Sequence, residues 1–201
     1  SAGGAPLEPA LFRADTDDEL PVARNVGGRS SFRNVGSARR QGAELSSTLP
    51  LATAWQLELA YTYVDATFRD DFPICTAAGC TTPTTLVAAG TRIPGVATQQ
   101  FSGRLQWQGE SWRAGAQVVA VGDVTVNDLG SERSPGYALL HLDIGRDWRI
   151  GLGRLRGFAR IDNVLDQRHI GSVIVNEGNG RFYEPGPGRG LMLGMRWHWR
   201  D

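Results

Sequence analysis

The stretch RFYEPGPGRGLMLGMRWHW, residues 181–199, ends in an alternating pattern that decides the fold. After Gly190, large apolar side chains occupy every second position: Leu191, Leu193, Met195, Trp197 and Trp199, with Met192, Gly194, Arg196 and His198 between them. Successive side chains of a strand point to opposite faces, so the pattern predicts a β-strand with one apolar face. Because two indole rings close that face, we expect it to meet a protein core or lipid rather than water.

Composition narrows the class of protein. The chain has 201 residues, 21 basic and 21 acidic side chains and a pI near 6.8, so no strong field favours nucleic acid or a highly charged substrate. It contains no apolar run of about 18 residues, which excludes transmembrane helices but not barrel strands, whose hydropathy signal is weak. The start, SAGGAPLEPA, lacks the pattern of a signal peptide, so we expect a mature chain or a piece of a longer one.

The same alternation recurs along the chain. It is clear in AWQLELAYTYVDATF (54–68), QQFSGRLQWQ (99–108), SWRAGAQVVAV (111–121) and GYALLHLDIGRDW (136–148), and less regular in GRLRGFARIDNVL (153–165), where Phe158 falls on the polar side. Residues 7–14, 19–26 and 37–49 are weaker candidates. The sequence therefore predicts an all-β, antiparallel, up-and-down meander of about nine strands.

The connections between these strands alternate in length. Short ones lie near 50–54, 109–111 and 149–153, and long ones near 27–36, 70–96, 127–135 and 166–188. Short turns at one end of the sheet and long loops at the other are typical of transmembrane β-barrels. The meander is thus expected to be part of such a barrel, or a reduced version of one.

The tryptophans support the membrane interpretation. All six lie within a few residues of a predicted short turn or of the C-terminus: Trp55, Trp107, Trp112, Trp148, Trp197 and Trp199. Indole rings prefer the lipid headgroup zone, so one rim of tryptophan predicts the interfacial girdle of a barrel. The alternative is a soluble β-sandwich binding module with these rings in its core.

The remaining motifs give few sites. Cys75 and Cys80, in PICTAAGCTTP, favour a small disulfide loop, with two free thiols as the alternative. His141 and Asp143 share the polar face of one strand, and we interpret them as a hydrated or salt-bridged pair because no nucleophile is placed beside them. We expect no enzyme activity, no metal site and no cofactor.

Three stretches resemble TonB-dependent outer-membrane receptors. Residues 25–46 resemble the strand–loop–strand that leads into their T-R-R-Q-G-x-E segment, which reads Ala38-Arg39-Arg40-Gln41-Gly42-Ala43-Glu44 here. RIPGVATQQFSGRLQW (92–107) is similar to their R-x-P-G-x-P loop exit. Residues 160–197 resemble their C-terminal signature, with Asn163-Val164-Leu165-Asp166 at a strand end and Pro185-Gly186-Pro187-Gly188-Arg189 before the last strand.

The resemblance implies a fold and a function. It implies that residues 1–201 are the C-terminal portion of a plugged barrel of about 22 strands, without the plug and the N-terminal strands. Such a receptor lies in the outer membrane of a Gram-negative bacterium and imports a chelated metal such as a ferric siderophore. Its partners would be outer-membrane lipid, the siderophore, the missing plug and barrel strands, and TonB acting through that plug; nucleic acid is not expected. A small autonomous outer-membrane barrel, an adhesin or a lipid-modifying enzyme, is the other membrane alternative.

The long loops are the candidates for ligand binding, because loops on a rigid barrel carry recognition. Arg69, Arg92, Arg181 and Tyr183 could meet an anionic chelate, with arginine supplying charge-assisted hydrogen bonds. The alternative is that these side chains pair with Asp70, Asp71 and Glu184 in the loops themselves.

Overall fold

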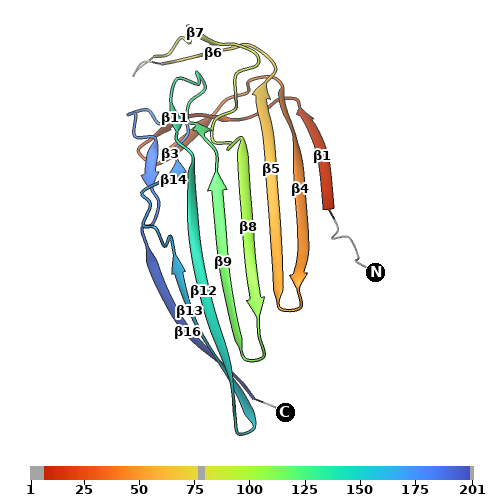
Figure 1. The fold of residues 1–201 in the computed structure, drawn as a ribbon. Helices are drawn as coiled ribbons and strands as arrows, with labels where there is room; N and C mark the ends of the chain where they lie inside the picture. The colour runs from red at the N-terminus through yellow and green to blue at the C-terminus, as the bar shows by residue number, and fades with distance from the viewer. Residues whose placement is uncertain (1–6, 77–79, 200–201) are drawn as a thin grey trace.

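A computed structural model describes residues 7–76 and 80–199, and it consists of one large antiparallel sheet with small hairpins at one end (Figure 1). The sheet has eight strands in the order β1-β4-β5-β8-β9-β12-β13-β16. Their bounds are β1 Leu7–Thr16, β4 Ala38–Ala52, β5 Trp55–Phe68, β8 Gln99–Gln108, β9 Trp112–Val121, β12 Tyr137–Ile150, β13 Gly153–Asp162 and β16 Gly190–Trp199. The predicted all-β, up-and-down meander is confirmed. No helix that could cross a membrane occurs in these residues.

The connections differ at the two ends of the sheet (Figure 1). Residues 53–54, 109–111 and 151–152 form the short turns, at the bottom of the view. Each long loop at the other end holds a hairpin: β2 Val22–Val26 with β3 Arg29–Phe32, β6 Phe72–Ile74 with β7 Thr85–Val87, β10 Val124–Thr125 with β11 Arg133–Ser134, and β14 Ile170–Val173 with β15 Tyr183–Pro185. The predicted alternation of connection length is therefore present.

The main sheet has eight strands rather than about nine, because residues 19–26 do not join it. Val22–Val26 pairs with Arg29–Phe32 across Gly27 and Gly28, which both have positive φ. Two consecutive residues in the left-handed conformation form the tight turn of a hairpin with a two-residue loop. Glycine adopts that conformation without steric cost. The chain therefore folds back within the loop, and β1 pairs directly with β4.

The sheet is a single open layer. Within the part of the chain that is described, β1 and β16 each have one neighbour in the sheet, and no second large sheet packs on either face. A sandwich needs two packed sheets, so the soluble-sandwich alternative is wrong. The sheet also does not close on itself into a small barrel.

The register separates an apolar face from a polar face. One row of paired residues crosses seven strands and is apolar throughout: Leu49, Leu57, Leu105, Ala116, Leu142, Ile161 and Leu191. Several apolar side chains near the β16 edge lie open, Leu193 at 72% and Met195 at 79% exposure. Exposed apolar surface on this scale marks an interaction surface, which for a sheet of this kind is lipid or further protein.

The buried core lies at the loop end rather than in the sheet. It consists of Val35, Ala38, Ala66, Phe68, Phe72, Ile74, Val87 and Ile93, contributed by the first two long loops and the adjoining strand ends. The rings of Phe68 and Phe72 meet edge to face at 4.8 Å. The loops are thus held by apolar packing, and they form a structured cap above the sheet.

Candidate functional site: a basic wall beneath a loop cap

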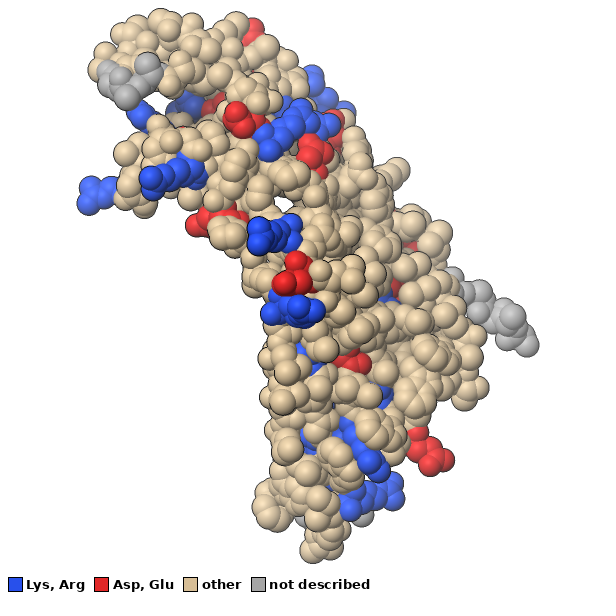
Figure 2. Space-filling view, turned by 60° about the vertical axis from the view of Figure 1, so that its left-hand side comes forward, with Lys and Arg blue, Asp and Glu red and all other residues tan. Residues whose placement is uncertain are grey.

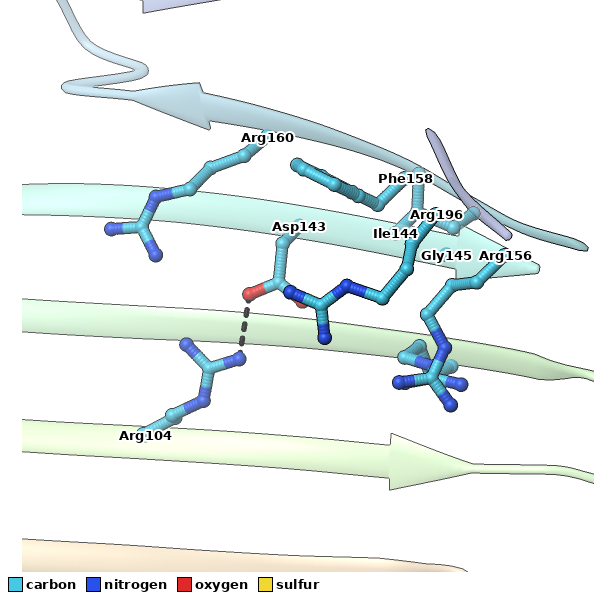
Figure 3. A pocket seen from close by; sticks show the side chains of 9 residues that line it. Arg104, Asp143, Ile144, Gly145, Arg156, Phe158, Arg160 and Arg196 are labelled. Atoms are coloured by element: carbon cyan, nitrogen blue, oxygen red, sulfur yellow. Dashed lines mark hydrogen bonds and ion pairs between the residues drawn. The ribbon is translucent and has the colours of Figure 1, made fainter. Parts of the chain in front are cut away.

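The polar face of the sheet carries a hollow of about 300 Å³ between β8 and β16 (Figure 3). Five arginines and one aspartate line it: Arg104, Arg113, Arg156, Arg160, Arg196 and Asp143. Strand periodicity places them on the polar face, because each lies an odd number of residues from the apolar row of its own strand. We call these six residues the basic wall.

Acidic side chains offset part of the charge of the basic wall. Arg104 donates to Asp143 at 2.7 Å, and Arg160 donates to Asp162 at 2.7 Å. Asp147 accepts from Arg113 at 2.6 Å, from Arg156 at 2.8 Å and also from Arg154. Figure 2 shows basic and acidic side chains next to one another down the molecule.

The wall nevertheless keeps a positive excess. Arg196 lies opposite Arg156 on the neighbouring strand, and it has no ion-pair partner within residues 7–76 and 80–199. Like charges directly opposite one another are unfavourable unless water or an anion lies between them. Guanidinium groups bind carboxylate and phosphate oxygens through two parallel hydrogen bonds, so the hollow is suited to an anionic group.

His141 and Asp143 lie on the polar face as predicted, but each has a different partner. His141 Nδ1 lies 2.8 Å from Asp162 Oδ1, whereas Asp143 accepts from Arg104. Neither contacts a hydroxyl or thiol nucleophile in the described residues, and no group there of three or more His, Cys, Asp or Glu could hold a metal. The geometry supports structural ion pairing at this place.

Polar joints connect the loops to one another. Asn176 Nδ2 donates to the Val22 carbonyl at 2.7 Å, and Asn176 Oδ1 accepts from the Asp128 amide at 3.0 Å. Asp128 in turn pairs with Arg33 at 2.5 Å, and the Gly95 amide donates to the Thr125 carbonyl at 2.8 Å. These contacts join all four long loops into one cap.

The carboxylate at this joint is nearly inaccessible to water. Asp128 is 1% exposed, and its Oδ1 atom has no hydrogen-bond partner among the described residues. Burial raises the pKa of Asp128 above its usual range, against the opposing effect of the bonds from Asn176 and Arg33. The loops therefore meet at a buried carboxylate whose charge is only partly compensated by its hydrogen-bond partners.

The loop residues predicted to bind ligand fall into two groups. Arg69 follows β5 directly and is exposed, and Arg92 is half-buried and bridges Thr67 of β5. Arg181 is exposed before β15, and the Tyr183 hydroxyl lies 3.3 Å from Glu132 and 3.2 Å from the Arg133 carbonyl. No contact between the two groups occurs in the described residues, so a ligand that touched all four would have to bridge them.

Cys75 and Cys80 form a disulfide, as the sequence favoured. Cys75 directly follows β6 and Cys80 precedes β7, and these two strands lie beyond the end of the sheet (Figure 1). The bond thus links the two arms of the hairpin that supplies Phe72, Ile74 and Val87 to the core.

The tryptophans lie on one face at one end. The pairings Trp55 with Trp107 and Leu155 with Trp197 place them on the apolar face, next to the short turns. Trp112, Trp148 and Trp199 occupy equivalent positions on their strands. Contact of this rim with lipid headgroups remains a prediction.

Sequence reasoning missed the loop joints and the unpaired member of the basic wall. The sequence pattern does not single out Asn176, Asp128 or Arg33. No periodic signal marks them, because their partners lie in loops distant in sequence. Arg196 could have been found by placing the polar faces of the last two strands opposite one another.

Comparison with known proteins identifies relatives. A family model described as "TonB dependent receptor-like, beta-barrel" matches residues 5–164. The ferrioxamine B receptor of Salmonella typhimurium (strain SL1344) is 23% identical over 174 residues, which are 84% of this chain and 22% of the receptor.

Solved structures share the fold. The siderophore receptor PiuA from Acinetobacter baumannii matches with a TM-score of 0.74 and 18% identity, over 96% of this chain and 26% of that chain. The ferric citrate transporter FecA in its unliganded form matches with a TM-score of 0.72 and 15% identity, over 98% of this chain and 29% of that chain. The chain thus spans less than a third of the length of these proteins.

Proposed function

The chain belongs to the TonB-dependent receptor β-barrel family, and from this premise we propose that it forms part of the barrel wall of a receptor that imports a chelated metal, such as a ferric siderophore. The family consists of outer-membrane transport receptors of Gram-negative bacteria, not of enzymes. In the proposed assembly, further strands complete the barrel, a plug fills its lumen, and TonB acts through that plug.

The observation that carries the proposal is the division of one open sheet into two unlike faces. The apolar face would meet lipid, and the basic wall would meet the lumen, where water or a plug can satisfy charges. The unpaired edges of β1 and β16 would receive neighbouring strands, because unsatisfied backbone groups in a bilayer cost several kcal/mol each.

The loop cap supplies the outward-facing surface. Arg69, Arg92, Arg181 and Tyr183 lie in the long loops, which face the exterior of the cell in barrels of this type. We propose that these groups contribute to capture of an anionic chelate. The joints at Asn176 and Asp128 would keep the loops in position for this contact.

Uptake by the full-length receptor tests the proposal. A strain that lacks other siderophore receptors would express the complete gene and receive radioactive iron on a hydroxamate, a catecholate or citrate. We expect one of these chelates to be imported, and import to require TonB. Absence of uptake for every chelate, or uptake that persists in a tonB deletion, would contradict the proposal.

Variants of the loops test the ligand contacts separately. Replacing Arg69 and Arg181 with Gln is expected to weaken binding of the imported chelate about tenfold, because two charge-assisted hydrogen bonds are lost. Arg29→Gln, an exposed arginine in β3, is the matched control. If the control and the double variant bind alike, the proposed contacts are wrong.

A further inference from the structure

Across β8, β9, β12, β13 and β16, one charged side chain lies on the apolar face of the sheet. Arg146 alternates in phase with Leu142 and Ile144 on β12, and its cross-strand partners are Trp112 and Gly157. Apart from Arg146, all residues that these five strands place on this face are uncharged. A permanently charged group that faces lipid has a high free-energy cost unless it is paired. We therefore expect a group that pairs with Arg146.

Two indole rings hold the guanidinium in place. Its central carbon lies 4.9 Å from the ring centre of Trp112 and 5.5 Å from that of Trp148. A cation over an aromatic face is attracted electrostatically, but this contact leaves the N–H donors of the guanidinium free. The rings thus orient Arg146 without supplying hydrogen-bond acceptors.

Those donors find no acceptor among residues 7–76 and 80–199. Arg146 Nε is buried and has no hydrogen-bond partner, and no ion pair joins Arg146 to any residue within 7–76 and 80–199. The nearest acidic groups along its strand, Asp143 and Asp147, lie on the opposite face and bind Arg104 and Arg113. The missing acceptor must therefore come from outside the described chain.

An apolar groove adjoins the guanidinium. Its volume is about 500 Å³, and Ile144, Ala159, Leu193 and Met195 supply the apolar lining beside Arg146. Gly157 provides room here, because a Cβ atom at that position would lie 2.8 Å from the Trp148 ring. A ligand that fits both the guanidinium and the groove has an anionic head group next to an alkyl chain.

We propose that Arg146, between Trp112 and Trp148, binds the phosphate of a membrane glycerophospholipid whose acyl chain lies in this groove. Charge complementarity selects the phosphate, and the apolar lining selects the chain. The site lies near the short turns, which in a barrel face the periplasm, so the lipid belongs to the inner leaflet of the outer membrane. This placement depends on the proposed function, because it requires the sheet to lie in a membrane.

Lipid titration of the purified full-length receptor tests the site. The delipidated receptor would be titrated with dioleoyl phosphatidylglycerol and, in parallel, with dioleoylglycerol, and bound lipid would be counted by native mass spectrometry. We expect the tightest phospholipid to bind about five- to tenfold more weakly to Arg146→Gln, because its charge-assisted hydrogen bonds are lost. Dioleoylglycerol, which has the same chains and no phosphate, is expected not to distinguish the wild type from the variant.

Two further variants serve as controls. Arg149→Gln removes an exposed arginine from the opposite face of the same strand and is expected to leave binding unchanged. Arg146→Lys keeps the charge and is expected to retain part of the affinity, which also covers the case in which Arg146→Gln fails to fold. The proposal is overturned if the folded Arg146 variants bind phosphatidylglycerol like the wild type, or if dioleoylglycerol depends on Arg146 equally. Because this assay needs no substrate, its failure can be distinguished from a failure of iron uptake.

Discussion

Asp147 shows how a single acidic residue organises the polar face. Its side chain is only 9% exposed. It accepts hydrogen bonds from Arg113 on β9 and from Arg154 and Arg156 on β13. A carboxylate surrounded in this way stabilises three cations that would otherwise repel one another. The position ties three strands together near the short turns.

Removing the charge of Asp147 is expected to destabilise the barrel. Asp147→Asn leaves three guanidinium groups without their shared acceptor, and we expect a loss of about 1–3 kcal/mol in the free energy of unfolding. Urea unfolding of the full-length receptor in vesicles measures this. The matched control is Asp123→Asn, which breaks one exposed pair with Arg133 and should change stability much less. Equal effects of the two substitutions would contradict the role given to Asp147.

Asp70 predicts a pH dependence of the loop cap. Its Oδ2 accepts from the Ser37 amide and hydroxyl, both at 2.7 Å, and the Ser37 hydroxyl lowers the pKa of Asp70 from its ordinary value of 3.8. Ionised Asp70 therefore favours the folded cap above pH 3.8, and this contribution is lost as the pH falls through the lowered pKa.

The melting temperature of the wild-type receptor should thus exceed that of Asp70→Asn at neutral pH, and the difference should shrink under strong acid. Asp17→Asn, at another exposed loop position, is the control. A difference that grows on acidification would show that the sign is wrong.

Individual side chains were predictable only where strand parity decides their direction. The polar direction of Phe158 follows from parity, and its ring lies over Gly194 on the neighbouring strand, where a Cβ atom would lie 2.3 Å away. Parity also places Arg146 on the apolar face. The contacts that hold it depend on which strand is adjacent, and a single strand's pattern does not contain that information.

At the scale of elements, the strands of the sheet were predictable because their two faces meet unlike surroundings. The predicted strands after residue 54 agree with β5, β8, β9, β12, β13 and β16 to within a few residues. The loop hairpins were not predictable in the same way. Their strands are two to five residues long, too short for a periodic signal, and they are stabilised by the cap rather than by alternation.

Asn176 is expected to determine how firmly the cap is held. Asn176→Ala removes the bonds to the Val22 carbonyl and the Asp128 amide, so hydrogen exchange should accelerate in β2 and in residues 122–136. Asn179→Ala is the matched control, because among the described residues the Asn179 side chain bonds only to the nearby Arg181 amide. Unchanged exchange in the Asn176 variant, measured by mass spectrometry on the full-length receptor, would contradict the role of this joint.

At the scale of the whole molecule, the open sheet determines what the chain can do alone. The β1 and β16 edges present backbone groups that lipid cannot satisfy. The up-and-down order was predictable from turn lengths, but the choice between open sheet, small closed barrel and part of a larger barrel was not. That choice depends on strand tilt and stagger around a full circle, which local alternation does not encode.

The 201-residue chain by itself is therefore expected not to insert into vesicles as a protected monomer, whereas the full-length receptor should. Protection from added protease after refolding measures this, and heat-dependent mobility on a gel reports the folded barrel. The full-length receptor carrying Asp123→Asn provides a matched folded control. A protease-resistant monomer formed by residues 1–201 would show that the sheet can complete itself.

The central claim is that one face of this sheet meets lipid and the other does not. The most direct test measures the accessibility of spin labels to oxygen and to a water-soluble nickel complex. The labels are placed one at a time at successive positions of β12 from Leu140 to Trp148, in the full-length receptor in bilayers. Oxygen accessibility should alternate with period two, be highest at Leu142 and Ile144, and fall towards Trp148 as the label nears the headgroups. Accessibility without alternation, or with its maxima at Asp143 and Asp147, would contradict the account.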